Sequence, residues 1–581
     1  MNRFLASAAA ILAISAGSLS AGPPPADDRD IVHVLSRTGF GPRPGDVERV
    51  RTLGIQRYVD EQLRPERIPD TAMTARLAGL MTIGLSSRQI AEQFELPQLE
   101  ARRQKKQDAK GNDASAGDGK QPPDAMQQRA NSVMMELSEQ KLLGAVYSER
   151  QLQEVLTDFW FNHFNVDARK GSDRFMITEY EREAIRPRVL GKFRDLLGAT
   201  AKSPAMLFYL DNWMSADPKG PHVTDTAVGR PRFARGPFGG RVMMPPPGRV
   251  AAQGNQKKNA PKGLNENYGR ELMELHTLGV DGGYTQKDVT EVARALTGWT
   301  IDRPRQGGGF TFNARIHDTG QKVVLGHVIK AGGGESDGEQ VLDILAKHPS
   351  TATFIATKLA RRFVSDTPPP ALVERVAARF RETGGDLREV MRAILTSPEF
   401  LSPDAYRAKV KTPFEFVVSA LRATGADVED ARPLVRELQQ LGMPLYMCQP
   451  PTGYKDTGDA WVNTGALVSR MNLAVRLAGG HLRGTSIRNP ESAIGNPESA
   501  IRSPESAIRS PESAIRNPDS AIGNPQSAIR NPESAIRNPQ SAIQSLLHGE
   551  ASETTRAIVG KATDTPTMVA LALGAPEFQR R

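Results

Sequence analysis

The sequence predicts a mainly α-helical protein, a multi-helix globular assembly with one small β-hairpin inserted in it. Apolar residues recur at helical spacing in short stretches along most of the chain, and a glycine or proline ends one stretch before the next begins. Residues 310–329 instead alternate and are bounded by glycines, which is typical of a hairpin. With 581 residues, the chain is long enough for one large core or two ordinary ones.

The N-terminus has the pattern of a secretory signal peptide. Arg3 supplies the positive charge, an apolar run follows from Leu5 to Leu19, and Ser18-Leu19-Ser20 forms a small-x-small cleavage site. The run is too short for a comfortable membrane span, and no cysteine follows the site to carry a lipid anchor. We therefore expect residues 1–20 to be removed on export to the periplasm or the outside of the cell. The mature chain is expected to have no transmembrane segment.

The hydrophobic content is 39%, low for a globular protein, so part of the chain is not expected to fold. We expect disordered loops near 101–130, which has almost no large apolar residue, and near 215–264, which is rich in Pro, Gly and Arg. The first carries seven Lys and Arg against four Asp, and the second nine against two. Their joint excess of ten positive charges accounts for the net charge of +9, so the rest of the chain is about neutral.

The basic net charge therefore does not indicate a basic fold. A nucleic-acid-binding protein holds its Lys and Arg on a folded face beside aromatic residues or a recognition helix, so no specific nucleic acid is expected as a partner. The basic loops are either simply solvated or attracted to an anionic envelope polymer. The single cysteine, Cys448, excludes an internal disulfide, so the exported fold has to be held by its core.

The main helical domain is expected to cover residues 27–480, and its first dense apolar run extends from Leu152 to His163. At about 100° per residue, His163 falls in the same apolar sector as Leu152. One interpretation is a core histidine whose ring nitrogens meet a carbonyl or a carboxylate. The other is a metal ligand or a general base at the floor of a cleft, because burial and a partner would tune its pKa.

Asn265 to Trp299 is the most polar part of this domain and has the pattern of two capped amphipathic helices. In the first helix Leu272 and Leu275 form the core face, and Glu271 and His276 flank that face. These two polar residues are therefore expected to be half-buried, with the helix starting at the asparagines just before them.

The second helix opens with Thr285 and Asp288, whose spacing is that of a capping box. The His317-Asp318 pair lies at the tip of the predicted hairpin or just before its second strand, where turn chemistry also explains it. The candidate catalytic residues are Glu271, His163 and His276, and the candidate binding residues are Asn265, Asn267, His317 and Asp318.

Residues 487–542 are eight consecutive heptads of the type I-R-N-P-E-S-A. A proline in every copy forbids a continuous helix, so the seven-residue period is not that of a coiled coil. The copy I-R-N-P-Q-S-A can be encoded by the unit ATCCGCA written three times, and a seven-nucleotide unit gives the same heptapeptide in any frame. We interpret the heptads as an expanded DNA repeat with no required function. Residues 544–581 are expected to be C-terminal helices that complete the helical domain.

The chain resembles the bacterial family called domain of unknown function 1800. The resemblance implies a helical, exported bacterial protein, often encoded beside another exported family that looks sulfatase-like, and it brings no activity or catalytic residue. It is carried by H-V-L-S-R-T-G-F-G-P at 33–42, D-F-W-F-N-H-F at 158–164, N-E-N-Y-G-R-E-L-M-E-L-H-T-L-G-V at 265–280, A-R-A-L-T-G-W at 293–299, H-D-T-G-Q-K at 317–322 and A-P-E-F-Q at 575–579.

Two functions are compatible with these patterns. The favoured one is a periplasmic binding or assembly protein, whose partner is another exported protein or an anionic envelope polymer. The alternative is a metal-assisted hydrolase that uses the His and Glu residues as ligands or bases. The sequence contains no H-E-x-x-H, no G-x-S-x-G, no phosphate-binding loop and no cysteine cluster, so it identifies no metal or cofactor.

Overall fold

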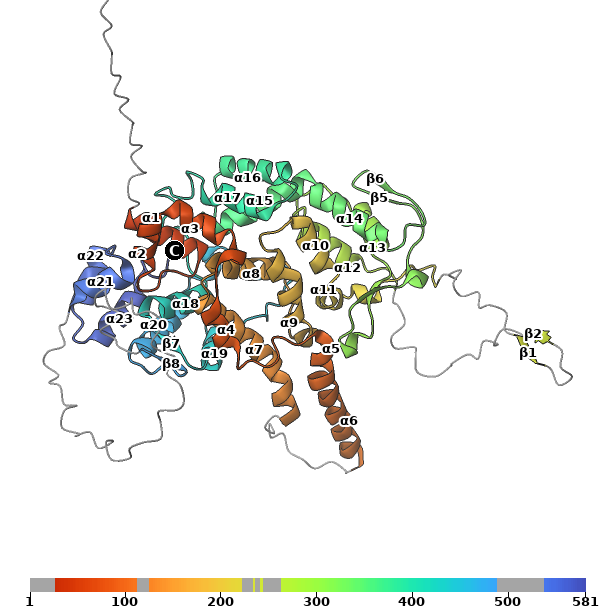
Figure 1. Ribbon diagram of the computed structural model, residues 1–581, viewed down its shortest axis with the longest axis horizontal. Coiled ribbons are helices and arrows are strands. Elements are labelled where there is room, and N and C mark those ends of the chain that lie inside the picture. Colours follow the sequence, from red (N-terminus) through yellow and green to blue (C-terminus); the bar gives the residue numbers. More distant parts are fainter. Residues whose placement is uncertain (1–26, 112–124, 222–232, 236–240, 244–262, 488–537) are drawn as a thin grey trace, which may run out of the picture.

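The computed structural model describes residues 27–111, 125–221, 233–235, 241–243, 263–487 and 538–581. The predicted signal peptide, most of the loop near 215–264 and most of the heptads lie outside these residues. Within them the protein is mainly α-helical, as the sequence predicts, and its strands form small antiparallel pairs (Figure 1). None of the helices in these ranges is long and apolar enough to cross a membrane.

The N-terminal part of the chain folds into helices, of which α8 lies in the middle of the molecule (Figure 1). They are α1 (Asp28–Thr38), α2 (Asp46–Leu53), α3 (Ile55–Gln62), α4 (Thr71–Leu77), α5 (Ser87–Ile90), α6 (Leu96–Gly111), α7 (Ala125–Tyr147), α8 (Gln151–His163), α9 (Ile177–Glu179), α10 (Phe193–Ala201) and α11 (Pro204–Tyr209).

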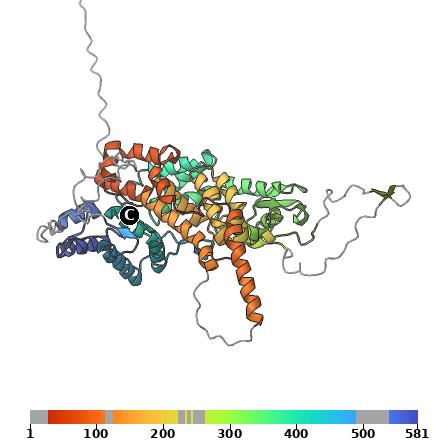
Figure 2. The same cartoon turned by 60° about the horizontal axis from the view of Figure 1, so that its bottom comes forward.

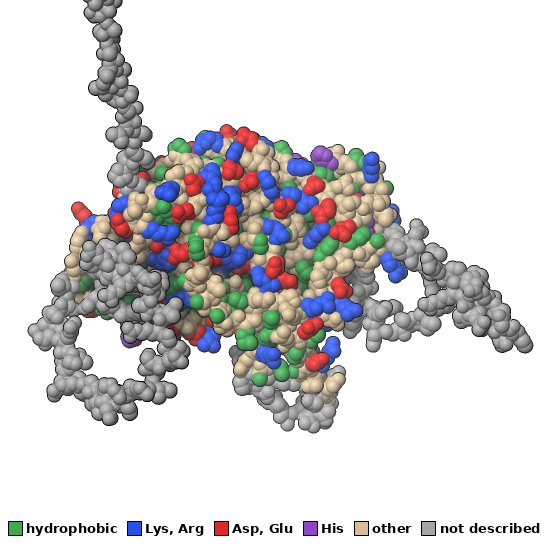
Figure 3. Space-filling model, in the orientation of Figure 1, with side chains coloured by type: hydrophobic (Ala, Val, Ile, Leu, Met, Phe, Trp, Pro, Cys, Tyr) green, Lys and Arg blue, Asp and Glu red, His purple; other side chains and the backbone are tan. Residues whose placement is uncertain are grey.

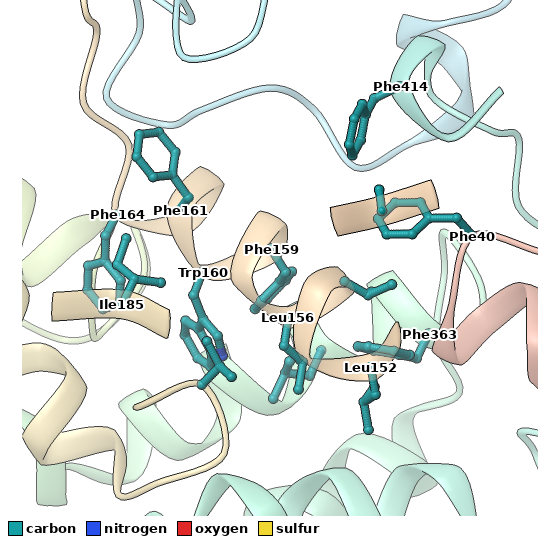
Figure 4. Close-up of a cluster of buried hydrophobic side chains, with 14 of the residues drawn as sticks. Phe40, Leu152, Leu156, Phe159, Trp160, Phe161, Phe164, Ile185, Phe363 and Phe414 are labelled. Atoms are coloured by element: carbon teal, nitrogen blue, oxygen red, sulfur yellow. The ribbon is translucent and has the colours of Figure 1, made fainter. Parts of the chain in front are cut away.

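Helix α8 is buried on nearly all sides. Figure 4 shows its large side chains pointing in different directions into the core, with Trp160 and Phe161 on different sides of the helix. Trp160 is 1% exposed and Phe161 4%. Phe161 meets the ring of Tyr446 edge-on at a centroid distance of 4.9 Å. A helix that is apolar almost all round is a core helix, so α8 joins the N-terminal helices to the rest of the fold.

The segment near 101–130, expected to be a disordered loop, is helical at both ends. Helix α6 continues to Gly111 and α7 begins at Ala125, while 112–124 lie outside the described residues. The expectation relied on the lack of large apolar residues. Ala, Lys, Arg and Gln are nevertheless good helix formers, so the end of α6 is helical without an apolar face. Figure 1 shows α6 projecting from the body of the protein beside α7.

Helices α12 (Glu266–Glu274) and α13 (Gln286–Ala295) form the central pair. The predicted capping box of α13 is present, because Thr285 accepts from the Asp288 backbone N–H and Asp288 accepts from that of Thr285. The two helices approach closely at Gly269, where an added Cβ would lie 3.0 Å from the Val289 carbonyl oxygen. A glycine is therefore required at this crossing.

The region predicted as a single hairpin at 310–329 contains parts of two. Strand β4 (Phe310–Phe312) pairs back with β3 (Trp299–Ile301), and β5 (Lys322–Val324) pairs with β6 (His327–Ile329). The second hairpin turns at Leu325 and Gly326, both at positive φ. The chain between the two pairs turns inward at His317, which is 1% exposed. Two further short pairs join β1 (Phe233–Arg235) to β2 (Arg241–Met243) and β7 (Asp427–Val428) to β8 (Thr485–Ser486).

The remaining helices cover the top and one end of the molecule, where α23 packs along α20 (Figures 1 and 2). They are α14 (Ser336–Lys347), α15 (Pro349–Phe363), α16 (Pro370–Glu382), α17 (Leu387–Leu395), α18 (Pro413–Thr424), α19 (Arg432–Gln440), α20 (Thr464–Ala478), α21 (Pro539–Leu547), α22 (Glu553–Gly560) and α23 (Thr565–Gly574).

The last heptad is part of this helical end. Its Asn538 side chain accepts from the backbone N–H groups of Gln540 and Ser541. Pro539 is the first residue of α21, and Ile543 directly after the heptad is 2% exposed. The C-terminal helices therefore begin inside the final copy, a few residues before the expected boundary at 544.

The visible surface carries charges of both signs. Lys and Arg alternate with Asp and Glu across the face shown in Figure 3, with no large area of one sign. This agrees with a folded body that is about neutral once the two basic segments are set aside.

Candidate functional site

His163 lies in the last turn of α8 and is 2% exposed. Its Nε2 is 3.1 Å from the backbone oxygen of His276, and since a carbonyl only accepts, Nε2 carries the proton. Nδ1 meets no hydrogen-bond partner among the described residues. The ring stands edge-on to Phe164 at 4.5 Å and to Trp160 at 5.3 Å. Burial, followed by the charge of Lys358, holds the pKa of His163 well below its usual range, so the ring is neutral.

His276 was expected to be half-buried, which is wrong, since it is 3% exposed. The expectation continued the helical angle beyond Glu274, where α12 ends. The centroid of the His276 ring lies 5.1 Å from that of Phe164 and 6.2 Å from that of His163. Burial lowers the pKa of His276 to about 3, with a second contribution from Lys358 on α15. Lys358 is half-buried, and burial lowers its pKa as well. Lys358 was not predicted as a site residue, because a lysine on an amphipathic helix usually faces solvent.

Glu271 is half-buried, as expected from its position beside the core face. Burial and then the neighbouring Glu274 raise the pKa of its carboxyl, while Arg270 opposes them. The backbone oxygen of Glu271 accepts from the N–H of His276 at 3.1 Å. Glu271, His276 and His163 are therefore linked through main-chain groups, with no hydrogen bond among their side chains.

Asn265 is the N-cap of α12. Its side-chain oxygen accepts from the N–H groups of Asn267 at 3.1 Å and Tyr268 at 3.3 Å, and its amide donates to the Leu210 carbonyl at 2.7 Å. These bonds satisfy both ends of the amide and tie α12 to the segment after α11. Asn267 itself is exposed in the first turn.

His317 belongs to a second group of residues, beside the β5–β6 hairpin. Its Nδ1 is 2.7 Å from the Thr297 carbonyl oxygen, and its Nε2 is 3.3 Å from Oδ2 of Asp337. Asp337 also accepts from Nζ of Lys322 at 2.7 Å, and both of these side chains are fully buried. The neighbouring Asp318 accepts from Nε and Nη2 of Arg294 at 2.7 and 3.0 Å.

Lys322 and Asp337 were not predicted. Lys322 lies within the H-D-T-G-Q-K motif, four residues after Asp318, so the spacing contained a signal. Asp337 lies in the first turn of α14, where an acidic residue is explained by the helix dipole alone. The predicted residues thus fall into two groups, one between α8 and α12 and one at the hairpin.

A shared metal centre would need several ligands that converge on one point. Among the residues that the structure describes, no three His, Cys, Asp or Glu side chains are grouped in a way that could hold a metal ion. The His and Glu residues of the predicted site therefore do not form an assembled ligand set in this part of the chain.

Two small cavities lie apart from both groups. One, of about 30 Å³, is lined by Asp158 and Asn162 of the D-F-W-F-N-H-F motif and by Lys141. The Nζ of Lys141 is 2.6 Å from Asp158, so the two charges neutralise each other. The other, of about 40 Å³, lies where α1 and the end of α21 meet the C-terminal segment, and we call it the C-terminal cavity. Its charged lining is mainly cationic, with Arg407, Lys411, Arg580 and Arg581.

Comparison with known proteins identifies a family and no characterised relative. No curated protein and no solved structure is significantly similar to the chain. The family described as "Protein of unknown function (DUF1800)" matches residues 33–580, nearly the whole chain. This protein belongs to that family.

Proposed function

We propose that the protein is exported and acts as a helical binding or assembly protein, without catalysis by its central His and Glu residues. The state of His163 and His276 is the main support, since both rings are almost fully buried and neutral at physiological pH. A general base or metal ligand has to reach a substrate or an ion. These rings instead face aromatic side chains and, for His163, a backbone carbonyl.

The proposed partner is another exported protein or an anionic envelope polymer. The cationic lining of the C-terminal cavity favours an anionic partner, although the visible surface carries mixed charges. Dextran sulfate tests this directly, with neutral dextran as the control. Binding of the mature chain to the sulfated polymer alone, weakening as salt rises, is the expected result. Equal binding to both polymers, or to neither, would count against an anionic partner.

Export is tested by fractionating cells that produce the full chain or a form without residues 1–20. The full chain is expected in the exported fraction with an N-terminus at Ala21, and the shortened form in the cytoplasm. A full chain that stays in the cytoplasm with its N-terminus intact would contradict this part of the proposal.

The competing hydrolase is tested by metal analysis of the purified protein and of His163→Ala. The binding proposal predicts that neither protein carries stoichiometric metal and that the substitution mainly lowers the melting temperature. Stoichiometric metal in the wild type that is lost in His163→Ala would overturn the proposal.

A further inference from the structure

The C-terminal cavity contains a buried lysine whose amine is in direct contact with no carboxylate of the described residues. Lys411 is 7% exposed and lines the cavity, and its Nζ makes no hydrogen bond or ion pair within the described part of the chain. Its nearest favourable contact is the ring of Phe578, whose centroid lies 3.8 Å from Nζ. A buried ammonium is costly unless it is paired with an anion. The nearby Glu415 favours the charged form of Lys411, but this carboxylate is already ion-paired with Arg362 and Arg581.

We propose that the C-terminal cavity binds a small oxyanion, such as a sulfate, phosphate or carboxylate group, with Lys411 as its main charge partner. The inference rests on the proposed binding function and names the chemical class that this function recognises. The group belongs either to a free ion or to an anionic polymer, and both present the same oxygens to the amine.

The other lining groups favour an anion. Arg407, Arg580 and Arg581 add positive charge, and Glu577 is the only carboxylate side chain among the lining residues. The Glu577 oxygens are already bonded, since they accept from the Ser552 N–H at 2.8 Å and from the Thr555 hydroxyl. Glu577 is thus held by the start of α22 and leaves Lys411 unpaired.

Two neutral histidines complete the lining. Burial, followed by the charge of Arg37, lowers the pKa of His33 to about 3. Burial, followed by Arg407 and Lys411, lowers the pKa of His548 to about 4. Both rings are uncharged at neutral pH, and each has an N–H that is able to donate to an oxyanion.

Charges of both signs lie behind the cavity, where Arg362 meets Asp158 at 3.9 Å and Asp456 at 4.0 Å. Glu415 is shared by two cations, Arg362 at 2.8 Å and Arg581 at 3.0 Å. Arg37 is fully buried, and its Nε and Nη1 meet no hydrogen-bond partner among the described residues. Its Nη2 donates only to backbone oxygens, those of Val364 and Ala405. The Arg37 guanidinium therefore has no ion-pair partner among the described residues, and its charge in a poorly solvated region favours an anion at the cavity mouth.

The size of the cavity agrees with a small group. A cavity has to measure about 10–15 Å³ to hold one buried water, and the C-terminal cavity measures about 40 Å³. It accepts a group of a few oxygens and excludes a folded partner. The smaller cavity beside α8 provides a contrast, because its Lys141 is already neutralised by Asp158 at 2.6 Å.

The test is calorimetric titration of the mature chain with sodium sulfate at constant ionic strength and pH 6.5. Sulfate is chosen because it does not titrate in this range. Lys411→Gln removes the proposed partner, and Lys561→Gln is the matched control because Lys561 is an exposed lysine after α22. We expect one sulfate per chain, a dissociation constant raised at least about tenfold in Lys411→Gln, and no change in Lys561→Gln.

The pH dependence supplies a second readout. Burial lowers the pKa of Lys411 to about 7, so sulfate affinity should fall by up to about tenfold per pH unit above pH 7. The facing groups do not share this titration. The pKa values of His33 and His548 lie far below it, and those of Glu415 and Glu577 are lowered, while Arg407, Arg580 and Arg581 are guanidinium groups. Sulfate binding that is independent of pH between 6.5 and 8.5 would contradict the role of Lys411.

Dextran sulfate distinguishes a failure of the cavity site from a failure of the proposed binding function. If the polymer binds and Lys411→Gln abolishes its binding, the group belongs to a polymer. If free sulfate binds but the polymer does not, the ligand is a free ion. Polymer binding that is unaffected by Lys411→Gln, with no binding of free sulfate, overturns the cavity site and leaves the proposed function standing. A melting curve for each variant without sulfate shows whether it is folded.

Discussion

Two buried lysines lie at opposite ends of the molecule, and they differ in whether the amine has hydrogen-bond partners. Lys322, at the β5–β6 hairpin, is fully buried and donates to Asp337 at 2.7 Å, to the Gly320 carbonyl at 3.0 Å and to the Asp318 carbonyl. Lys411, at the C-terminal cavity, is almost as buried, but its amine makes no hydrogen bond among the described residues and lies 3.8 Å from the centre of the Phe578 ring. An amine whose three donors are all used fixes the fold around it, whereas an amine with unused donors is available to a ligand.

The largest effect is expected at Lys322. Lys322→Met removes the partner of Asp337 and leaves a buried carboxylate beside His317, which should lower the free energy of unfolding by about 3–5 kcal/mol. Denaturant unfolding measures this, and Lys330→Met, at an exposed lysine just after β6, is the control. If Lys322→Met lowers the free energy of unfolding by less than about 1 kcal/mol, the hydrogen-bonded amine does not stabilise the hairpin, and the contrast with Lys411 is wrong.

His163 is an intermediate case, because one ring nitrogen is bonded and the other is not. His163→Ala should cost about 2–4 kcal/mol through the cavity that it leaves among aromatic rings and the unpaired His276 carbonyl. Glu271→Ala, at a half-buried side chain with no hydrogen bond to either histidine, should stay within about 0.5 kcal/mol. Chemical denaturation compares the two, and a Glu271→Ala loss as large as that of His163→Ala would indicate a coupled side-chain site.

A pH series tests the unpaired amine. The pKa of Lys411 is about 7 in the folded chain and is normal in the unfolded chain, so the unfolded state binds more protons between those values. The buried charge destabilises the fold fully below pH 7, and this penalty is lost as pH rises above 7. Wild-type stability should therefore gain about 2 kcal/mol relative to Lys411→Met between pH 7 and 9. Parallel pH profiles for the two proteins would show that the amine is already paired.

The smallest effect is expected from the heptads. Deleting three copies, residues 515–535, shortens the connection between Ile487 and Asn538 and leaves the copy that begins α21. Loop-closure entropy then changes stability by only about 0.5 kcal/mol. Sulfate binding at the C-terminal cavity should be unchanged, although Leu546 and His548 follow the heptads in sequence. A large loss of either property would contradict a repeat without required function.

Local signals in the sequence predicted much of the fold. The capping box at Thr285 and Asp288 and the helix start near Asn265 depend on contacts within four residues, which spacing reveals directly. The core face of α12 was predicted only in part, since Leu272 is buried as expected, whereas Leu275 is half-buried and Met273 is buried. The end of α6 was missed because its helix lacks an apolar face, and the hairpins were merged because strand alternation does not specify the partner strand.

The candidate site was predicted less well, for a different reason. Lys322 meets Asp337 across 15 positions, and the surroundings of Lys411 come from both ends of the chain. The spacing of residues along the sequence does not predict contacts between such distant positions. A charged residue on a helix or strand has the same appearance in the sequence whether its partner is present or missing. For His163, one interpretation was a core histidine that meets a carbonyl or a carboxylate, but the sequence does not show that the partner is the His276 carbonyl.

The start of α21 inside the last heptad has a consequence for how the chain can change over time. Three DNA units encode one heptad, so every in-frame gain or loss adds or removes whole heptads and leaves a complete copy next to Ile543. That copy supplies an asparagine or serine cap followed by proline at the first helical position, which is how α21 begins. Copy number is therefore free to drift between strains while the helix start is regenerated each time, and length variants should be a common natural polymorphism of this gene.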